Sequence, residues 1–163
     1  MILTDVCVLV AAYRDEHPEH SRCRHFLQTM LLGEESFGVS DLILSGFLRI
    51  VTNPRIFAQP SPPEHAIRFA ESLRRQPHAV QVSPGRRHWQ LFLSLCEEAV
   101  ARGNLVPDAF FAAMAIESGC EWITLDGDFA RFRALRWRTP PRIQAPTPTV
   151  HYATRSTVAR RDG

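Results

Sequence analysis

Residues 2–12 read Ile-Leu-Thr-Asp-Val-Cys-Val-Leu-Val-Ala-Ala, and a single aspartate, Asp5, separates two apolar runs. The first run, Ile2–Thr4, has the length and composition of a buried strand, whereas Val6–Ala12 has helical content. These residues therefore predict a short buried strand followed at once by a helix, with Asp5 at the carboxyl end of the strand. A carboxylate is costly to bury without a partner, so Asp5 is the first candidate functional residue.

The same alternation continues along the chain. Gly, Pro and capping residues divide it into further expected strands and helices. The strands are expected at 37–39, 79–82, 122–125 and 135–137, and the helices at about 17–32, 41–52, 64–75, 86–102, 108–118 and 129–132. Strands that alternate with helices predict an α/β fold with a central, mostly parallel sheet flanked by helices. In such sheets ligands bind at the carboxyl ends of the strands.

Length and composition set the class of protein. The 163 residues, 45% apolar and 22% charged, suit one globular domain and exclude wholesale disorder. We expect this domain at 1–137, followed by a Pro/Arg-rich C-terminal tail at 138–163. The longest apolar run, Val6–Tyr13, has eight residues, whereas a membrane span needs about 20. No basic signal-peptide region opens the sequence, so we expect no membrane insertion and a cytoplasmic location.

The charge is unevenly distributed. All 19 basic residues are arginine, and the formal net charge is +2. Residues 1–130 carry 11 arginines against 16 acids, whereas residues 131–163 carry eight arginines against one acid. This asymmetry predicts either a polyanionic partner or a solvated tail. Arginine also binds phosphate bidentately, which lysine does not.

Neither the cysteines nor the histidines form a metal-binding pattern. The four cysteines contain no Cys-x-x-Cys pair, so we expect buried free thiols rather than a zinc site or disulfides. The seven histidines lack acidic or cysteine companions, and we interpret them as surface residues.

Four of the seven aspartates stand at predicted strand ends or at a helix start, beside apolar runs: Asp5, Asp108, Asp126 and Asp128. Taken singly, Asp108 and Asp128 can be helix caps, and Asp126 with Gly127 can be a turn. Taken together, carboxylates at neighbouring strand ends repel one another, and a cation must neutralise them. Oxygen ligands favour Mg²⁺ or Mn²⁺. The pattern predicts a metal-dependent phosphodiesterase or nuclease.

Four segments in this order resemble the PIN-domain VapC ribonuclease toxins: 2–10, 46–54 (Gly-Phe-Leu-Arg-Ile-Val-Thr-Asn-Pro), Pro107-Asp108-Ala109 and 123–132. The resemblance covers residues 1 to about 137. It implies a PIN-like fold and a Mg²⁺-dependent endoribonuclease that cleaves RNA phosphodiester bonds with a metal-activated water. It further implies a homodimer and a cognate VapB-type antitoxin.

The resemblance also implies roles for individual residues. Asp5, Asp108 and Asp126 match the metal-binding acids, and Asp128 matches an auxiliary catalytic acid. Thr124 matches a residue that forms hydrogen bonds within the acidic cluster. Arg49 matches an arginine that contacts substrate or the second subunit.

Two departures leave an alternative open. Cys7 stands where the family usually has Asn, and residues 42–48, Leu-Ile-Leu-Ser-Gly-Phe-Leu, lack the family's helix Glu. Asp41, one turn away, is a candidate substitute and equally a helix cap. The alternative is a catalytically weakened PIN-like module that binds RNA or a partner. A receiver-like regulatory domain is set aside because that fold needs a lysine, and this chain has none.

Three apolar helices, at Val6–Tyr13, Phe26–Leu32 and Leu42–Val51, contain more apolar surface than one small domain covers. We expect most of it to be core. The remainder is a candidate for the homodimer face or for an antitoxin groove.

Overall fold

The computed structural model describes residues 1–143, so most of the expected C-terminal tail, with His151, lies outside the described residues. The centre of the fold is a five-stranded sheet in the order β3-β2-β1-β4-β5, and all four strand pairs are parallel. The strands are β1 (Ile2–Thr4), β2 (Phe37–Val39), β3 (Ala79–Gln81), β4 (Glu121–Ile123) and β5 (Trp137–Arg138). The predicted α/β fold with a parallel sheet is confirmed.

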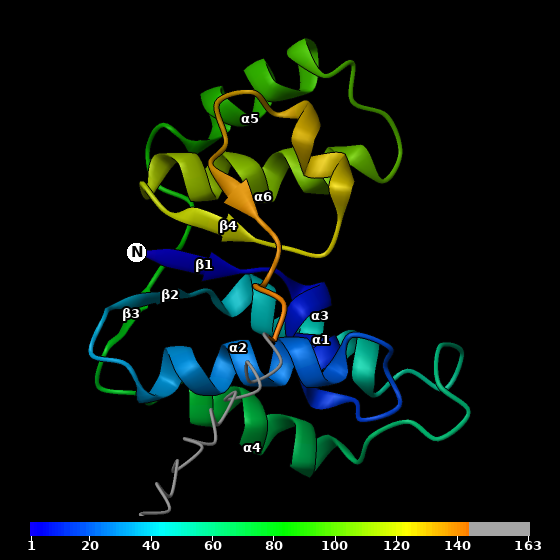
Figure 1. Cartoon of the computed structure of the whole chain (residues 1–163). Coiled ribbons are helices and arrows are strands. Elements are labelled where there is room, and N and C mark those ends of the chain that lie inside the picture. The colour runs from blue at the N-terminus through cyan, green and yellow to red at the C-terminus, as the bar shows by residue number, and fades with distance from the viewer. Residues whose placement is uncertain (144–163) are drawn as a thin grey trace, which may run out of the picture.

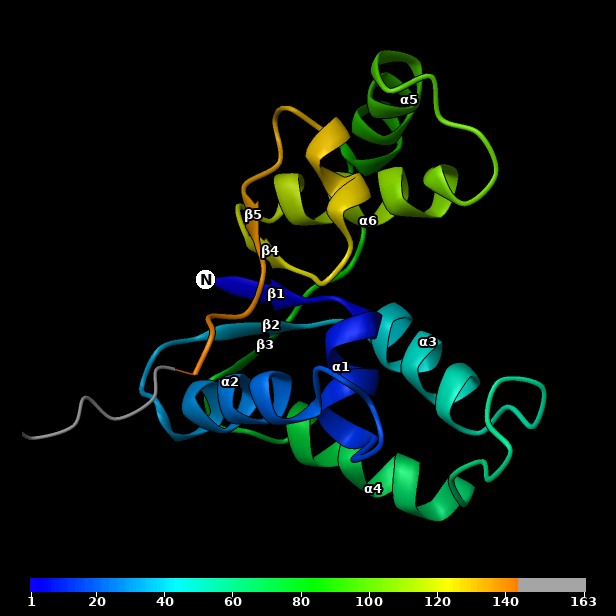
Figure 2. The same cartoon turned by 45° about the vertical axis from the view of Figure 1, so that its right-hand side comes forward.

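The helices cover the sheet on two sides (Figures 1 and 2). One layer contains α1 (Val6–Tyr13), α2 (His20–Leu32), α3 (Asp41–Val51) and α4 (Pro63–Arg74). The other layer contains α5 (His88–Glu98), α6 (Leu105–Glu117) and the short 3₁₀ helix η1 (Gly127–Arg131). The chain builds β1, β2 and β3 outward in one direction and then returns to place β4 and β5 beyond β1. Because crossovers between parallel strands are right-handed, this reversal moves the later helices to the opposite face.

At the carboxyl ends of β1 and β4 the connections that leave the two strands diverge to opposite faces, and this is the position where ligands bind in open parallel sheets. In the β1–β4 register Leu3 pairs with Trp122 and Thr4 pairs with Ile123. The backbone N–H of Asp5 then donates to the carbonyl of Ile123 at 2.9 Å. Asp5 and Thr124 therefore leave the sheet side by side.

Helices α1 and α6 are apolar on nearly all sides, because each of them lies between the sheet and other helices. Helix α1 packs against α2 and α3, and α6 packs against α5 and β4. Helix α3 approaches α1 closely at Gly46, where an added Cβ would lie 3.0 Å from Val6 Cγ2. The residue beside Val6 on α3 is therefore required to be small.

Three helix boundaries differ from the sequence prediction by three residues or more. Helix α2 begins at His20 rather than at about residue 17. Helix α6 begins at Leu105 rather than at Asp108. Pro107 fits the first turn, because the backbone N–H that proline lacks would have no partner there. Helix α5 ends at Glu98, before the predicted residue 102. Val100 there adopts a left-handed φ of 50°, and the N–H of Ala101 donates to the carbonyl of Cys96 at 2.8 Å. These contacts close α5 without a glycine.

The histidine prediction was wrong for His88. This side chain is buried, Nε2 donates to the carbonyl of Phe110 at 2.9 Å, and the ring packs between Phe92 and Phe110. The aromatic contacts and the carbonyl partner account for the burial of this side chain. All four cysteines are free thiols, as predicted, but only Cys23 and Cys120 are buried, whereas Cys7 and Cys96 are partly exposed.

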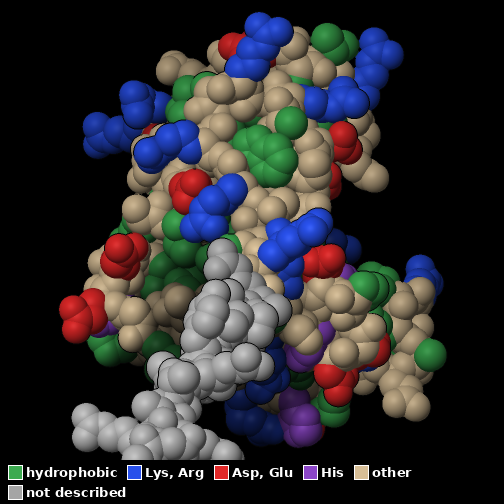
Figure 3. Space-filling model, in the orientation of Figure 1, with side chains coloured by type: hydrophobic (Ala, Val, Ile, Leu, Met, Phe, Trp, Pro, Cys, Tyr) green, Lys and Arg blue, Asp and Glu red, His purple; other side chains and the backbone are tan. Residues whose placement is uncertain are grey.

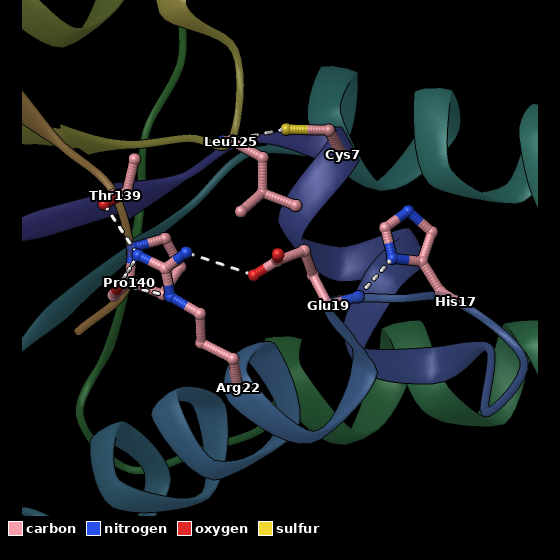
Figure 4. Close-up of polar contacts among 7 residues, drawn as sticks. All are labelled: Cys7, His17, Glu19, Arg22, Leu125, Thr139 and Pro140. Carbon is pink, nitrogen blue, oxygen red and sulfur yellow. Dashed lines mark hydrogen bonds and ion pairs between the residues drawn. The ribbon is translucent and has the colours of Figure 1, made fainter. Parts of the chain in front are cut away.

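The described chain continues past β5 and is held against α2. Arg22 donates from Nε to the carbonyl of Pro140 at 2.7 Å and from Nη2 to Thr139 Oγ1 at 2.8 Å (Figure 4). The same guanidinium pairs with Glu19 at 3.1 Å, and Pro140 is buried. Within residues 1–143, every helix is too short or too polar to cross a membrane.

Candidate active site

Asp5 is the buried centre of the site. Its side chain lies directly after β1 and is 8% exposed. Oδ2 accepts hydrogen bonds from Thr124 Oγ1 at 2.5 Å and from Cys7 Sγ at 3.2 Å. Burial raises the pKa of Asp5, and these two donors oppose that rise because they stabilise the charged carboxylate. The carboxylate is thus held in one orientation.

Thr124 and Cys7 connect the ends of β1 and β4. Thr124 is fully buried, and its Oγ1 accepts from the N–H of Asp126 at 3.0 Å while it donates to Asp5. The N–H of Leu125 points toward Cys7 Sγ at 3.4 Å (Figure 4). Burial, with the neighbouring Asp5 carboxylate, raises the pKa of Cys7 to about 12. Cys7 is therefore a neutral thiol that donates to Asp5, at the position where the family has an amide.

Asp126 and Asp128 are the more accessible acids at the end of β4. Asp126 caps η1, since its Oδ1 accepts from the N–H of Asp128 at 2.8 Å. Both carboxylates are exposed, and Asp128 pairs with Arg131 at 3.4 Å. The capping function considered in the sequence is therefore present at a different residue, because Asp126 caps η1, whereas Asp128 and Asp108 lie in the first turns of η1 and α6.

Asp108 connects α6 to this group. Burial raises its pKa most, the charges of Asp126, Asp5 and Asp128 add to the rise in that order, and together they bring the pKa to about 6. The structure therefore places Asp108 within electrostatic reach of the other three aspartates. A cation bound among them would relieve this repulsion.

The donors suit a particular class of metal. Among residues 1–143, no three His, Cys, Asp or Glu side chains are arranged closely enough to enclose a metal ion. A zinc site needs three or four protein ligands, so the arrangement does not fit zinc. Mg²⁺ keeps several waters and is usually held by one or two carboxylates. The residues fit a hydrated Mg²⁺ or Mn²⁺ rather than an ion fully enclosed by protein.

Two other candidates lie apart from the four aspartates. Asp41 Oδ1 accepts from Arg74 Nε at 3.0 Å, and this hydrogen bond lowers the pKa of Asp41. Asp41 therefore faces α4 and does not substitute for the missing helix Glu. Arg49 is exposed on α3, and no hydrogen bond or ion pair joins it to the acids within the described chain.

Within the described residues, α3 adds no carboxylate to the group around Asp5. The α3 residue packed against Val6, next to Asp5, is Gly46, and a larger side chain there would displace Val6. The sequence pattern did not reveal this contact or the hydrogen bond from Cys7 to Asp5. The only available signal was the position of Cys7, two residues after a strand-end acid.

Comparison with known proteins agrees with this geometry. A family model described as "PIN domain" matches residues 2–135. "Ribonuclease VapC25" of Mycobacterium tuberculosis (strain ATCC 25618 / H37Rv) is 45% identical over 141 residues, which cover 86% of this chain and 99% of the relative.

Two solved structures share the fold at low sequence identity. VapBC2 from Rickettsia felis, solved with a DNA fragment from its promoter, has a TM-score of 0.60 at 16% identity and covers 85% of this chain and 98% of its own. VapC20 of Mycobacterium tuberculosis, described as a "Sarcin-Ricin loop cleaving toxin", has a TM-score of 0.59 at 15% identity. The match covers 80% of this chain and 93% of VapC20.

Proposed function

The chain belongs to the PIN-domain family of VapC-type ribonucleases, and on this premise we propose that it is a Mg²⁺-dependent endoribonuclease, the toxin of a toxin–antitoxin pair. PIN-domain ribonucleases are metal-dependent in general. The observation that carries the proposal for this chain is the position of Asp108, whose carboxylate lies among those of Asp5, Asp126 and Asp128. We expect the protein to act in the cytoplasm.

Asp5 and Asp108 are the proposed metal ligands, and within residues 1–143 no third acid is close enough to form a three-carboxylate shell with them. When bound, Mg²⁺ supplies Lewis acidity, which lowers the pKa of a coordinated water and offsets negative charge on the phosphate. Thr124 and Cys7 hold Asp5 Oδ2, so the ligand need not reorganise when the ion arrives. Asp126 and Asp128, both exposed, are placed to orient water on the solvent side of the phosphodiester.

A metal-removal experiment tests this proposal. A labelled single-stranded RNA should be cleaved by the wild-type protein in Mg²⁺, remain intact in EDTA, and be cleaved again when Mg²⁺ or Mn²⁺ is restored. The second candidate function, a module that binds RNA without cleaving it, is favoured by Gly46 at the α1–α3 contact and by the pairing of Asp41 with Arg74. Binding without cleavage under all three conditions would support that module and contradict the nuclease.

We further propose that α2 presents the surface for an antitoxin or for a second copy of the chain. A pocket of about 430 Å³ beside α2 is lined in part by Phe26 and Met30. A second pocket, of about 340 Å³, is lined in part by Leu27 and Leu31. Leu32, at the end of α2, is 87% exposed. Apolar surfaces of this kind are typical of protein–protein contacts.

Light scattering after size exclusion measures both associations. The protein alone should have the mass of two chains, and adding the cognate VapB-type antitoxin should increase this mass and inhibit RNA cleavage. Leu32→Glu should weaken one of these two associations. The matched control is Leu93→Glu, because Leu93 is an exposed leucine on α5. A monomer that keeps full cleavage activity with the antitoxin present would contradict the proposal.

A further inference from the structure

A further pocket, separate from the two beside α2, adjoins the four aspartates. It has a volume of about 290 Å³ and lies between the α5–α6 connection and η1. In Figure 3, basic side chains are spread over both flanks of the half of the molecule that contains α5 and α6, with acidic side chains among them. The lining residues are Val100, Arg102, Asn104, Leu105, Asp128 and Arg131.

The backbone of the α5–α6 connection places its polar side chains in this pocket. Val100 and Gly103 adopt left-handed φ values of 50° and 56°, which turn the chain sharply twice within four residues. The N–H of Leu105 then donates to the carbonyl of Arg102 at 3.2 Å. This turn presents Arg102 and Asn104 toward η1.

The polar groups of the pocket are available to a ligand. Within residues 1–143, the side chains of Arg102 and Asn104 make no hydrogen bond and no ion pair, and both are exposed. Arg131 has one ion pair, to Asp128 at 3.4 Å, between side chains that are 58% and 62% exposed. Such an exposed pair contributes little and exchanges readily. Two guanidinium groups and one amide, facing a single carboxylate, form a site for an anion.

A chain of hydrogen bonds connects this pocket to the buried acid. The N–H of Asp128 donates to Asp126 Oδ1 at 2.8 Å, and the N–H of Asp126 donates to Thr124 Oγ1 at 3.0 Å. Thr124 Oγ1 in turn donates to Asp5 at 2.5 Å. Asp128 thus belongs both to the pocket wall and to the acidic group, so an anion in the pocket would lie next to the proposed cleavage site.

We propose that this pocket binds a backbone phosphate of the RNA that flanks the scissile phosphodiester, with Arg102 and Arg131 as its ligands. The inference rests on the proposed ribonuclease function, because it names the part of the substrate that this surface holds. Arg102 is free to bind the phosphate bidentately, and Arg131 turns from Asp128 to share it. Asn104 adds a neutral donor. The pocket fixes the register of the strand and contributes no group to bond cleavage.

Binding to RNA in EDTA tests the pocket separately from cleavage. The probe is a fluorescently labelled single-stranded RNA, and the variants are Arg102→Ala, Arg131→Ala and Arg68→Ala. Arg68 is the matched control, since it is an exposed arginine on α4, on the other side of the sheet. Each pocket variant should weaken binding by about fivefold or more and reduce the slope of log K against log salt by about 0.7–1, whereas the control should change both less.

Kinetics in Mg²⁺ give the second measurement. Both pocket variants should raise KM with little change in kcat, because the pocket binds substrate and transition state equally. Arg102→Lys should restore the charge but only part of the affinity, since lysine lacks the bidentate fork.

Three results would overturn the inference. Unchanged RNA affinity in both pocket variants, or an equal loss in Arg68→Ala, would show that this pocket does not hold the RNA. Retained RNA affinity with lost antitoxin binding would assign the surface to a protein partner instead. Absence of cleavage by the wild-type protein would contradict the ribonuclease proposal alone, because the binding measurement in EDTA still tests the pocket.

Discussion

Asp108→Asn is expected to abolish RNA cleavage and, in the same protein, to increase stability when no metal is present. Cleavage should fall by at least about 100-fold, because the variant loses a proposed ligand of the ion that activates water. Stability should rise because Asp108 is partly buried among three other carboxylates, and neutral Asn removes that repulsion. Solvent screening of this half-exposed group reduces the gain to the order of 1 kcal/mol at neutral pH.

The pH dependence of stability follows from the same group. The pKa of Asp108 is raised from 3.8 to about 6 in the folded protein, so between these values the folded state binds more protons than the unfolded state. The free energy of unfolding should therefore increase as the pH falls from above 6 toward 4. The raised pKa of Asp5 acts in the same direction. Asp108→Asn should remove part of this increase.

Thermal unfolding in EDTA at about pH 5 and about pH 7.5 measures this effect. The relevant quantity is the difference between wild type and variant, which cancels the titration of the histidines. Asp41→Asn is the matched control. Its effect on stability should have the opposite sign, because Arg74 lowers the pKa of Asp41. That control should be slightly less stable at neutral pH and should retain cleavage. A less stable Asp108→Asn protein that still cleaves RNA would contradict the assigned role.

Thr124→Val is expected to have the second large effect on cleavage and stability, although Thr124 is fully buried. Valine keeps the shape of threonine but removes the donor to Asp5 Oδ2 at 2.5 Å and the acceptor of the Asp126 N–H at 3.0 Å. A buried carboxylate that loses a partner costs about 2–3 kcal/mol of stability. The pKa of Asp5 should rise further, because the Thr124 hydrogen bond lowers it. Cleavage should fall by about 10–100-fold, as for other partners that orient metal ligands.

Two comparisons make this prediction specific. Thr124→Ser keeps the hydroxyl and should recover most of the cleavage, with a small loss of stability from the missing methyl group. Thr29→Val removes an exposed hydroxyl that donates to the carbonyl of His25 on α2, and it should leave cleavage unchanged. The measurements are the unfolding free energy in urea and the cleavage rate at saturating Mg²⁺. Normal cleavage by Thr124→Val at every Mg²⁺ concentration would show that Asp5 needs no such support.

Much of the architecture could be predicted from local patterns. The apolar run at Ile2–Thr4, followed by Asp5 and a second apolar run, predicts a buried strand and a buried helix, because the two runs differ in length. Helix ends were less accurate. The end of α5 depends on the left-handed Val100, a conformation that β-branched residues rarely adopt. His88 was placed at the surface because its buried partners, Phe92 and Phe110, are recognised only once α5 and α6 pack together.

The sequence by itself determined the order of strands and helices and the placement of the aspartates at strand ends and at a helix start. These features depend on residues that are neighbours along the chain, so local physical chemistry suffices. Only the tertiary structure decided which acids meet. It joined Asp5 to Thr124 across 119 positions, turned Asp41 toward Arg74, and set Arg102 opposite Arg131 beside Asp128. Such contacts depend on how parallel strands align and how helices pack, and no local pattern encodes that alignment.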